Sequence, residues 1–118
     1  MALTEPAAID IRHGAIVLVA APDDASGGPR ACVVVQADLF NDSHATVTVC
    51  PLTTVVGGEV LFRVAISPQE HTGLTVECEV QVDRITSIRR HRIVKLLGHA
   101  SATRMEQVDQ ALRRWLAL

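Results

Sequence analysis

The stretch GGPRACVVVQ, residues 27–36, joins a loop directly to a buried strand. Its glycines and proline are typical of a turn, whereas the nearly continuous β-branched run after Arg30 is typical of a strand buried on both faces. Arg30 stands at the boundary between the two. A cation fixed at a strand entrance is either a structural ion-pair partner or part of a functional site, and the surrounding sequence has to distinguish these roles.

Five further segments contain strand-like runs: 14–21, 41–50, 61–66, 74–83 and 84–100. The run 74–83 alternates most regularly, which predicts a strand with one face in the core and one in solvent. Its predicted core residues are Leu74, Val76, Cys78, Val80 and Val82. Its predicted solvent-facing residues are Thr75, Glu77, Glu79, Gln81 and Asp83.

Only the last segment, SATRMEQVDQALRRWLAL (101–118), is clearly helical. Ser101 is a plausible N-cap, and one apolar stripe follows with helical periodicity. The stripe consists of Met105, Val108, Ala111, Leu112, Trp115 and Leu116. Trp115, the sole tryptophan, is expected to anchor the helix to the sheet.

Five to seven short antiparallel strands followed by one C-terminal helix predict an α+β fold with a small, twisted, barrel-like sheet. Residues 12–118 are expected to form a single domain and residues 1–11 an N-terminal extension, with a loop at 22–29.

Composition excludes several classes of protein. The chain is 48% hydrophobic and 20% charged, which is typical of a globular domain, and its apolar runs are far shorter than the roughly 20 residues of a membrane span. The N-terminus lacks a signal peptide, which favours a cytoplasmic protein. The odd number of cysteines predicts buried, reduced thiols at Cys32, Cys50 and Cys78. The five histidines are scattered without metal-ligand spacing, so no metal or other cofactor is expected.

Charge is distributed unevenly along the chain. Residues 1–83 carry 3 basic and 11 acidic side chains (−8), residues 84–118 carry 8 basic and 2 acidic ones (+6), and the sum is the net charge of −2. A basic C-terminal third suits a phosphate backbone or an acidic peptide as partner. The alternative is that the two regions simply attract each other within the fold.

Two motifs carry a resemblance to the MazF/PemK (Kid) toxin family. RACVVVQADLFN (30–41) is similar to the family pattern R-P-x-V-V-x-Q-x-D-x-x-N, and TVTVCPLTT (46–54) is similar to T-x-x-V-x-P-x-T-[ST]. The matched segments follow in order from about residue 12 to 118. The resemblance implies an SH3-like antiparallel β-barrel with a C-terminal helix, as in CcdB, Kid and MazF. It also implies a cytoplasmic, homodimeric, metal-independent ribonuclease that cuts single-stranded RNA and is silenced by a MazE/PemI-like antitoxin peptide.

The resemblance places the catalytic pair on Arg30 and Thr53. Cleavage by the ribose 2′-hydroxyl requires neutralisation of charge on the phosphoryl oxygens, and a permanently charged, planar guanidinium suits that task. Thr53 and its neighbour Thr54 would offer hydroxyls to the RNA. From the residues alone, both threonines also fit ordinary turn hydroxyls, and Arg30 also fits an ion pair with Asp23 or Asp24.

Three further residues are expected to contact RNA. Asp83 matches an aspartate that Kid-type members place after a long strand, and it would serve as a base or a hydrogen-bond acceptor, with Arg84 beside it. The structural alternative is an ion pair between Asp83 and Arg84. His13, expected near the cleft, is a candidate proton carrier.

Several positions depart from the family pattern. The opening R-G-[DE] is His13-Gly14-Ala15 here, R-P is Arg30-Ala31, and D-Q is Asp83-Arg84. The loop glutamate of many members is missing from PDDASGG, so the cut-site sequence cannot be transferred. Two other functions stay open: a CcdB-like gyrase inhibitor, although this chain ends in WLAL instead of Trp-Gly-Ile, and a catalytically degenerate module that binds RNA or a partner.

Overall fold

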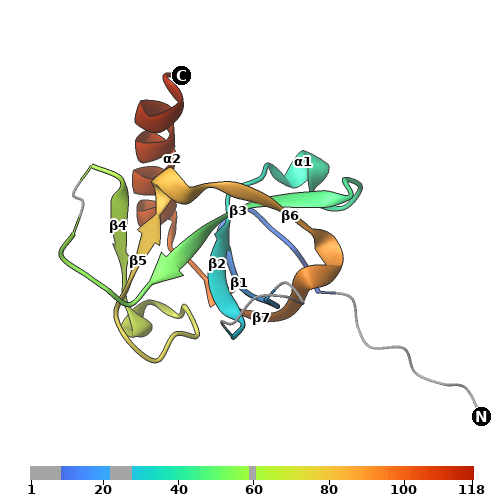
Figure 1. Cartoon of the computed structure of the whole chain (residues 1–118), viewed down its shortest axis with the longest axis horizontal. Helices are drawn as coiled ribbons and strands as arrows, with labels where there is room; N and C mark the ends of the chain where they lie inside the picture. The colour runs from blue at the N-terminus through green and yellow to red at the C-terminus, as the bar shows by residue number, and fades with distance from the viewer. Residues whose placement is uncertain (1–8, 22–27, 59–60) are drawn as a thin grey trace, which may run out of the picture.

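The computed structural model describes residues 9–21, 28–58 and 61–118, and in these ranges it contains seven strands, two helices and three 3₁₀ turns (Figure 1). The strands are β1 (Ala15–Val19), β2 (Arg30–Val34), β3 (Thr46–Thr53), β4 (Arg63–Ile66), β5 (Cys78–Gln81), β6 (Thr86–Arg89) and β7 (Ile93–His99). The helices are α1 (Asp38–Asn41) and α2 (Ala102–Leu116), and the 3₁₀ turns are η1 (Pro68–Glu70), η2 (Val82–Arg84) and η3 (Arg90–Arg92). Most of the expected 1–11 extension and 22–29 loop lies outside the described residues.

The strands form one antiparallel sheet in the order β4-β5-β3-β2-β1-β7, with β6 also paired to β3. β3 pairs with three strands. Its first half pairs with β6, its end pairs with β5, and β2 pairs along its other side. Pro51, which has no N–H to donate, lies where β3 changes partner. The expected antiparallel α+β fold is confirmed, but the sheet is not closed into a barrel, since within the described ranges no ladder joins its end strands.

Two apolar clusters fill the fold. One lies between the sheet and α2 and includes Ile16, Val33, Val80, Met105 and Val108. The other is formed by residues of β1, β2, β3, β6 and β7, and includes Val17, Val34, Val47 and Ile88. All three cysteines are buried, as expected of small hydrophobes. In the part of the chain that the structure describes, no helix is long and apolar enough to cross a membrane.

The predicted C-terminal helix is confirmed. Ser101 Oγ accepts a hydrogen bond from Arg104 N over 3.1 Å and so caps one of the free N–H groups of the first turn. The stripe is buried at Met105, Val108 and Ala111. Trp115 stays half exposed, yet it contacts the sheet side of the molecule through an edge-to-face stack on Phe62, with 5.1 Å between ring centroids.

The predicted strand 74–83 is too long. Only Cys78–Gln81 is a strand, Val76 is 51% exposed, and Val82 belongs to η2. Gly73 explains the shortening, because it has φ +73° and lies so close to β7 that a Cβ would stand 2.0 Å from Leu97 O. The chain before Cys78 therefore turns against β7 instead of extending the sheet.

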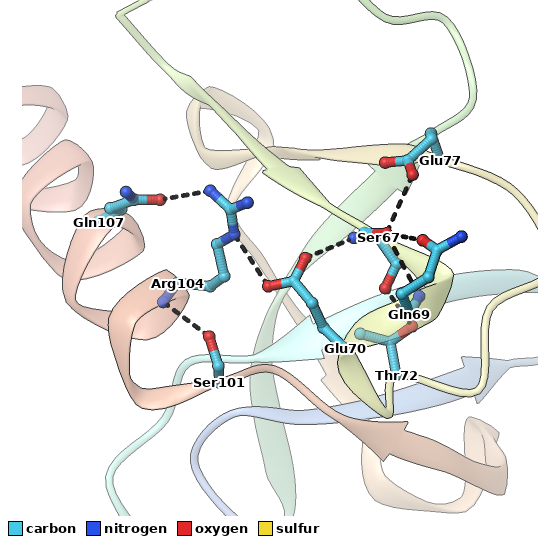
Figure 2. A network of polar contacts seen from close by, with 8 residues as sticks. All are labelled: Ser67, Gln69, Glu70, Thr72, Glu77, Ser101, Arg104 and Gln107. Atoms are coloured by element: carbon cyan, nitrogen blue, oxygen red, sulfur yellow. Dashed lines mark hydrogen bonds and ion pairs between the residues drawn. The ribbon is translucent and has the colours of Figure 1, made fainter.

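Figure 2 shows the polar contacts that link the connection between β4 and β5 to α2. Ser67 N donates to Glu70 Oε2 over 3.0 Å, and the other carboxylate oxygen of Glu70 accepts from Arg104 Nε over 3.1 Å. Thr72, which is buried, donates its hydroxyl to Ser67 O. Glu70 thus links the β4–β5 connection to the first turn of the helix.

Candidate active site

The register of β2 and β3 places Arg30 and Thr53 on the same face of the sheet. The ladder between the two strands ends at the pair Cys32 and Pro51, and Arg30 and Thr53 each lie two residues beyond that pair. Residues two apart in a strand share a face. The two expected catalytic residues therefore lie on one face, each two residues from the end of the ladder.

β5 and β4 extend the same face. Thr53 pairs with Glu79, and Gln81 pairs with Arg63. We call this surface the Arg30 face. It comprises Arg30, Cys32, Pro51, Thr53, Arg63, Glu79 and Gln81. The opposite side of the same strands carries Val33, Leu52, Val64 and Val80, which pack in the α2 cluster, so a stiff, buried layer supports the polar face.

Arg30 itself is exposed, and its Nη2 donates a hydrogen bond to Gln81 Oε1 over 3.3 Å. Gln81 is 6% exposed, although its place in the alternating run predicted a solvent-facing residue. Among the described residues, no carboxylate lies within ion-pair distance of Arg30. The alternative partners Asp23 and Asp24 lie outside the described residues.

Thr53 and Glu79 both hold the segment that follows β3. Thr53 Oγ1 accepts a hydrogen bond from Val55 N, and Glu79 Oε2 accepts one from Gly57 N, each over 3.1 Å. Glu79 Oε1 is buried and has no hydrogen-bond partner. A buried carboxylate oxygen without a partner is costly, and such groups are often found at functional sites. The alternating sequence pattern did not distinguish Glu79 from an ordinary surface residue.

Asp83 and Arg84 have separate surroundings. Asp83 forms an ion pair with Arg63, a residue that the sequence did not single out. The alternative ion pair between Asp83 and Arg84 is therefore not formed. Arg84 and Thr54 are both exposed, and within the described ranges neither side chain makes a hydrogen bond or ion pair.

A pocket of about 340 Å³ opens beside Arg30. It is lined by residues of β1, β2, β3 and β6 and by Arg92 of η3, and its polar side chains include Thr86 and Ser87. Arg92 donates from Nε and Nη2 to Ala20 O over 3.1 and 2.8 Å, and Ala20 N donates back to Arg92 O. Arg92 therefore fixes the chain where it leaves β1. Cys32 also lines the pocket, and burial raises the pKa of its thiol to about 11.

His13 does not join this group. Its Nδ1 lies 3.2 Å from Val35 O, just beyond the end of β2, whereas Arg30 begins β2 and pairs with Val19. Its Nε2 lies 3.6 Å from Asp109 of α2. The expectation that His13 stands near the arginine is therefore wrong, because the length of the strand separates them.

Three arginines of the basic C-terminal third donate hydrogen bonds to backbone oxygens. Arg90 donates to His44 O, Arg92 to Ala20 O and Arg114 to Leu61 O. In the described ranges, only Arg104 pairs with a carboxylate of the acidic region, that of Glu70. Of the eight basic side chains in this third, one therefore forms an ion pair with the acidic region within the described ranges.

Comparisons with known proteins show which family the chain belongs to. The model of the PemK-like, MazF-like toxin of type II toxin-antitoxin systems matches residues 12–116. The probable endoribonuclease MazF of Mycolicibacterium smegmatis is 33% identical over 108 residues, covering 92% of this chain and 98% of the relative. Endoribonuclease MazF9 of Mycobacterium tuberculosis is 34% identical over 94 residues, covering 75% of this chain and 79% of the relative.

Solved structures show the same fold. A MazE-MazF crystal structure from Deinococcus radiodurans superposes with a TM-score of 0.78 at 24% identity, covering 92% of this chain and 97% of that one. Mycobacterium tuberculosis toxin MazF-mt6 gives a TM-score of 0.75 at 19% identity, covering 88% and 97%. Family match, sequence identity over nearly the whole chain and shared fold lead to one conclusion: this chain belongs to the PemK-like, MazF-like toxin family of type II toxin-antitoxin systems.

Proposed function

We propose that this chain is a type II toxin that cleaves single-stranded RNA without a metal ion, with Arg30 and Thr53 as its catalytic residues. The observation that supports the proposal is the register of β2 and β3, which puts Arg30 and Thr53 on the same face of the sheet, with no carboxylate within ion-pair distance of Arg30 among the described residues. Both curated relatives above are named as endoribonucleases, which supports the reaction class.

The chemistry follows from the residue types. The ribose 2′-oxygen attacks its own phosphorus, the bond to the 5′-oxygen breaks, and the products are a 2′,3′-cyclic phosphate and a 5′-hydroxyl. Arg30 would neutralise charge on the non-bridging oxygens, because a guanidinium is cationic and offers paired donors. Thr53 would donate its hydroxyl to the same phosphate, since its oxygen already accepts from Val55 N and its proton stays available. Holding both groups on strands pre-aligns them before RNA arrives.

Other residues are proposed to bind the RNA strand around the reacting phosphate. Thr54 and Arg84, both exposed, would contact it next to the Arg30 face, and Asp83 would accept a hydrogen bond from a base. His13 lies at the far end of β2, so any contact it makes would involve a distant part of the bound strand.

We also propose a cognate antitoxin of the MazE/PemI type, whose acidic tail would neutralise Arg30 and Arg84, and a homodimeric toxin in the cytoplasm. Two solved structures with this fold are described as complexes: a mycobacterial endoribonuclease with its cognate antitoxin, and MazE-MazF of Deinococcus radiodurans. An acidic, disordered segment could pair with Arg30, because this arginine is exposed and has no carboxylate partner among the described residues.

The test is incubation of the purified protein with a long mixed RNA in EDTA. Discrete fragments with 2′,3′-cyclic phosphate or 3′-phosphate ends are expected, and the addition of the cognate antitoxin should abolish them. Intact RNA together with trapped gyrase–DNA complexes would instead select the gyrase inhibitor, and intact RNA without an effect on gyrase would select a degenerate binding module.

A further inference from the structure

Arg30 donates a hydrogen bond to a neutral side chain, although the Arg30 face also carries Glu79, and Asp83 follows Gln81 by two residues. We propose that Gln81 is a positioning residue of the active site, which fixes the Arg30 guanidinium without cancelling its charge and so keeps it open to a phosphate. The inference rests on the proposed function for its link to RNA cleavage.

The geometry makes Gln81 a specific support for Arg30. β5 is separated from β2 by β3, and neighbouring strands lie about 4.8 Å apart, so the Arg30 side chain has to cross β3 to reach Gln81 Oε1. This contact therefore holds the guanidinium over β3, the strand that carries Thr53. Gln81 is 6% exposed, which leaves its amide little freedom to move away.

The nearby carboxylates have partners other than Arg30, although one oxygen of Glu79 has no hydrogen-bond partner. Asp83 is paired with Arg63, and Glu79 Oε2 accepts from Gly57 N. Arg63 is the direct cross-strand neighbour of Gln81, so the ion pair with Asp83 keeps the second arginine of the face occupied. Of the two arginines on the Arg30 face, only Arg30 has no carboxylate partner among the described residues.

A neutral acceptor and a charged one would have different effects on the site. An amide oxygen orients the guanidinium through a hydrogen bond and leaves the full positive charge for the substrate. A carboxylate at the same place would form a charge-assisted, bidentate pair and compete directly with the phosphate for the same N–H groups. The role assigned to Gln81 therefore predicts that Gln81→Glu, which replaces the amide nitrogen with an oxygen, is enough to prevent phosphate from binding to Arg30.

The first experiment compares Gln81→Glu, Gln81→Met and the control Gln110→Glu, which adds the same charge on an exposed position of α2. Binding of a 2′-O-methyl RNA, which cannot be cleaved, is measured by fluorescence anisotropy, and kcat and KM are measured on the matching RNA. Gln81→Glu should weaken RNA binding at least about tenfold. Gln81→Met should keep binding within about threefold and lower kcat about tenfold, because the charge remains and its alignment is lost. Gln110→Glu should match the wild type.

A double-mutant cycle tests whether the effect passes through Arg30. In an Arg30→Ala background, Gln81→Glu should change RNA binding less than about twofold, because the partner it would neutralise is absent. Equal losses with and without Arg30 would overturn the proposal, and so would wild-type affinity of the folded Gln81→Glu variant. Thermal unfolding followed by circular dichroism identifies any variant that fails to fold.

A second probe separates this inference from the proposed function. Inorganic phosphate is titrated while the Arg30 Nε–H signal is followed by NMR. The wild type and Gln81→Met should show a saturable shift, and Gln81→Glu should not. This pattern together with intact RNA would refute the nuclease and leave the role of Gln81 standing, whereas RNA cleavage with identical phosphate binding in all three proteins would overturn the role of Gln81 alone.

Discussion

Thr53 and Glu79 face each other across β3 and β5, and each accepts a backbone hydrogen bond from the segment that follows Thr53. In the proposed mechanism Thr53 would have two functions, because its hydroxyl oxygen accepts from the chain after β3 while its proton remains available to the phosphate. Glu79 secures the same segment two residues further on, at Gly57.

Thr53→Val should reduce both activity and stability. We expect kcat/KM for RNA cleavage to fall about 10–100-fold, since one donor to the phosphate is lost, and the free energy of unfolding to fall by about 1 kcal/mol, since Val55 N loses its acceptor. The measurements are cleavage kinetics and urea unfolding. Thr75→Val, at an exposed threonine outside the sheet, is the matched control and should leave both unchanged. A Thr53→Val enzyme with wild-type kinetics would exclude Thr53 from catalysis.

Gly73→Ala should strongly destabilise the fold. Gly73 has φ +73°, and an added Cβ would stand 2.0 Å from Leu97 O, so the connection must move away from β7. Urea unfolding should show a loss of at least about 2 kcal/mol. Gly58→Ala is the control, because nothing lies within 4 Å of its Cβ position, and it should be neutral or up to about 1 kcal/mol more stable. Similar stabilities of the two variants would disprove the close approach at Gly73.

The buried thiols should make stability decrease at alkaline pH. Burial raises the pKa of Cys50 to about 12 and that of Cys32 to about 11 in the folded chain, whereas an unfolded cysteine ionises near pH 8.5. Above that pH the unfolded state loses protons that the native state keeps, so the free energy of unfolding falls by about 1.4 kcal/mol per pH unit for each thiol. The decline starts near pH 8.5 and continues until the native thiols ionise. Burial also raises the pKa of the third thiol, Cys78, which therefore acts in the same direction.

Cys50→Ala isolates this effect. Urea unfolding under reducing conditions between pH 8 and pH 10.5 should show a decline that is shallower than the wild type by about 1.4 kcal/mol per pH unit. If Cys50→Ala lowers the free energy of unfolding by the same amount at every pH, the substitution only leaves a cavity and the Cys50 thiol does not ionise on unfolding.

Local patterns predicted the elements whose structure is decided locally. The helix 102–116 carries its own cap at Ser101 and a stripe of helical period, so its start and buried face could be read directly. The strand 74–83 was predicted too long, because alternation does not report the approach of Gly73 to β7. The four-residue helix α1 was not predicted, since DLFN is too short to show any period.

The same distinction between local patterns and tertiary contacts applies to the residues of the candidate site. Arg30 and Thr53 were proposed because family motifs mark them, and the register puts both on one face of the sheet. Gln81 and Glu79 were assigned to a solvent-exposed face, since alternation reveals which residues share a face and not what covers them. His13 was misplaced because the antiparallel pairing of β1 with β2 was not applied to it: this pairing puts the start of β1 beside the end of β2, away from Arg30.

The most direct test is the rate of RNA cleavage in EDTA by Arg30→Ala, beside Arg113→Ala, which removes an exposed arginine of α2 far along the chain from the site. If Arg30 supplies the charge that stabilises the phosphate, kcat/KM should fall at least about a thousandfold for Arg30→Ala and stay within about twofold for Arg113→Ala. Cleavage by a folded Arg30→Ala protein at the wild-type rate would contradict the account.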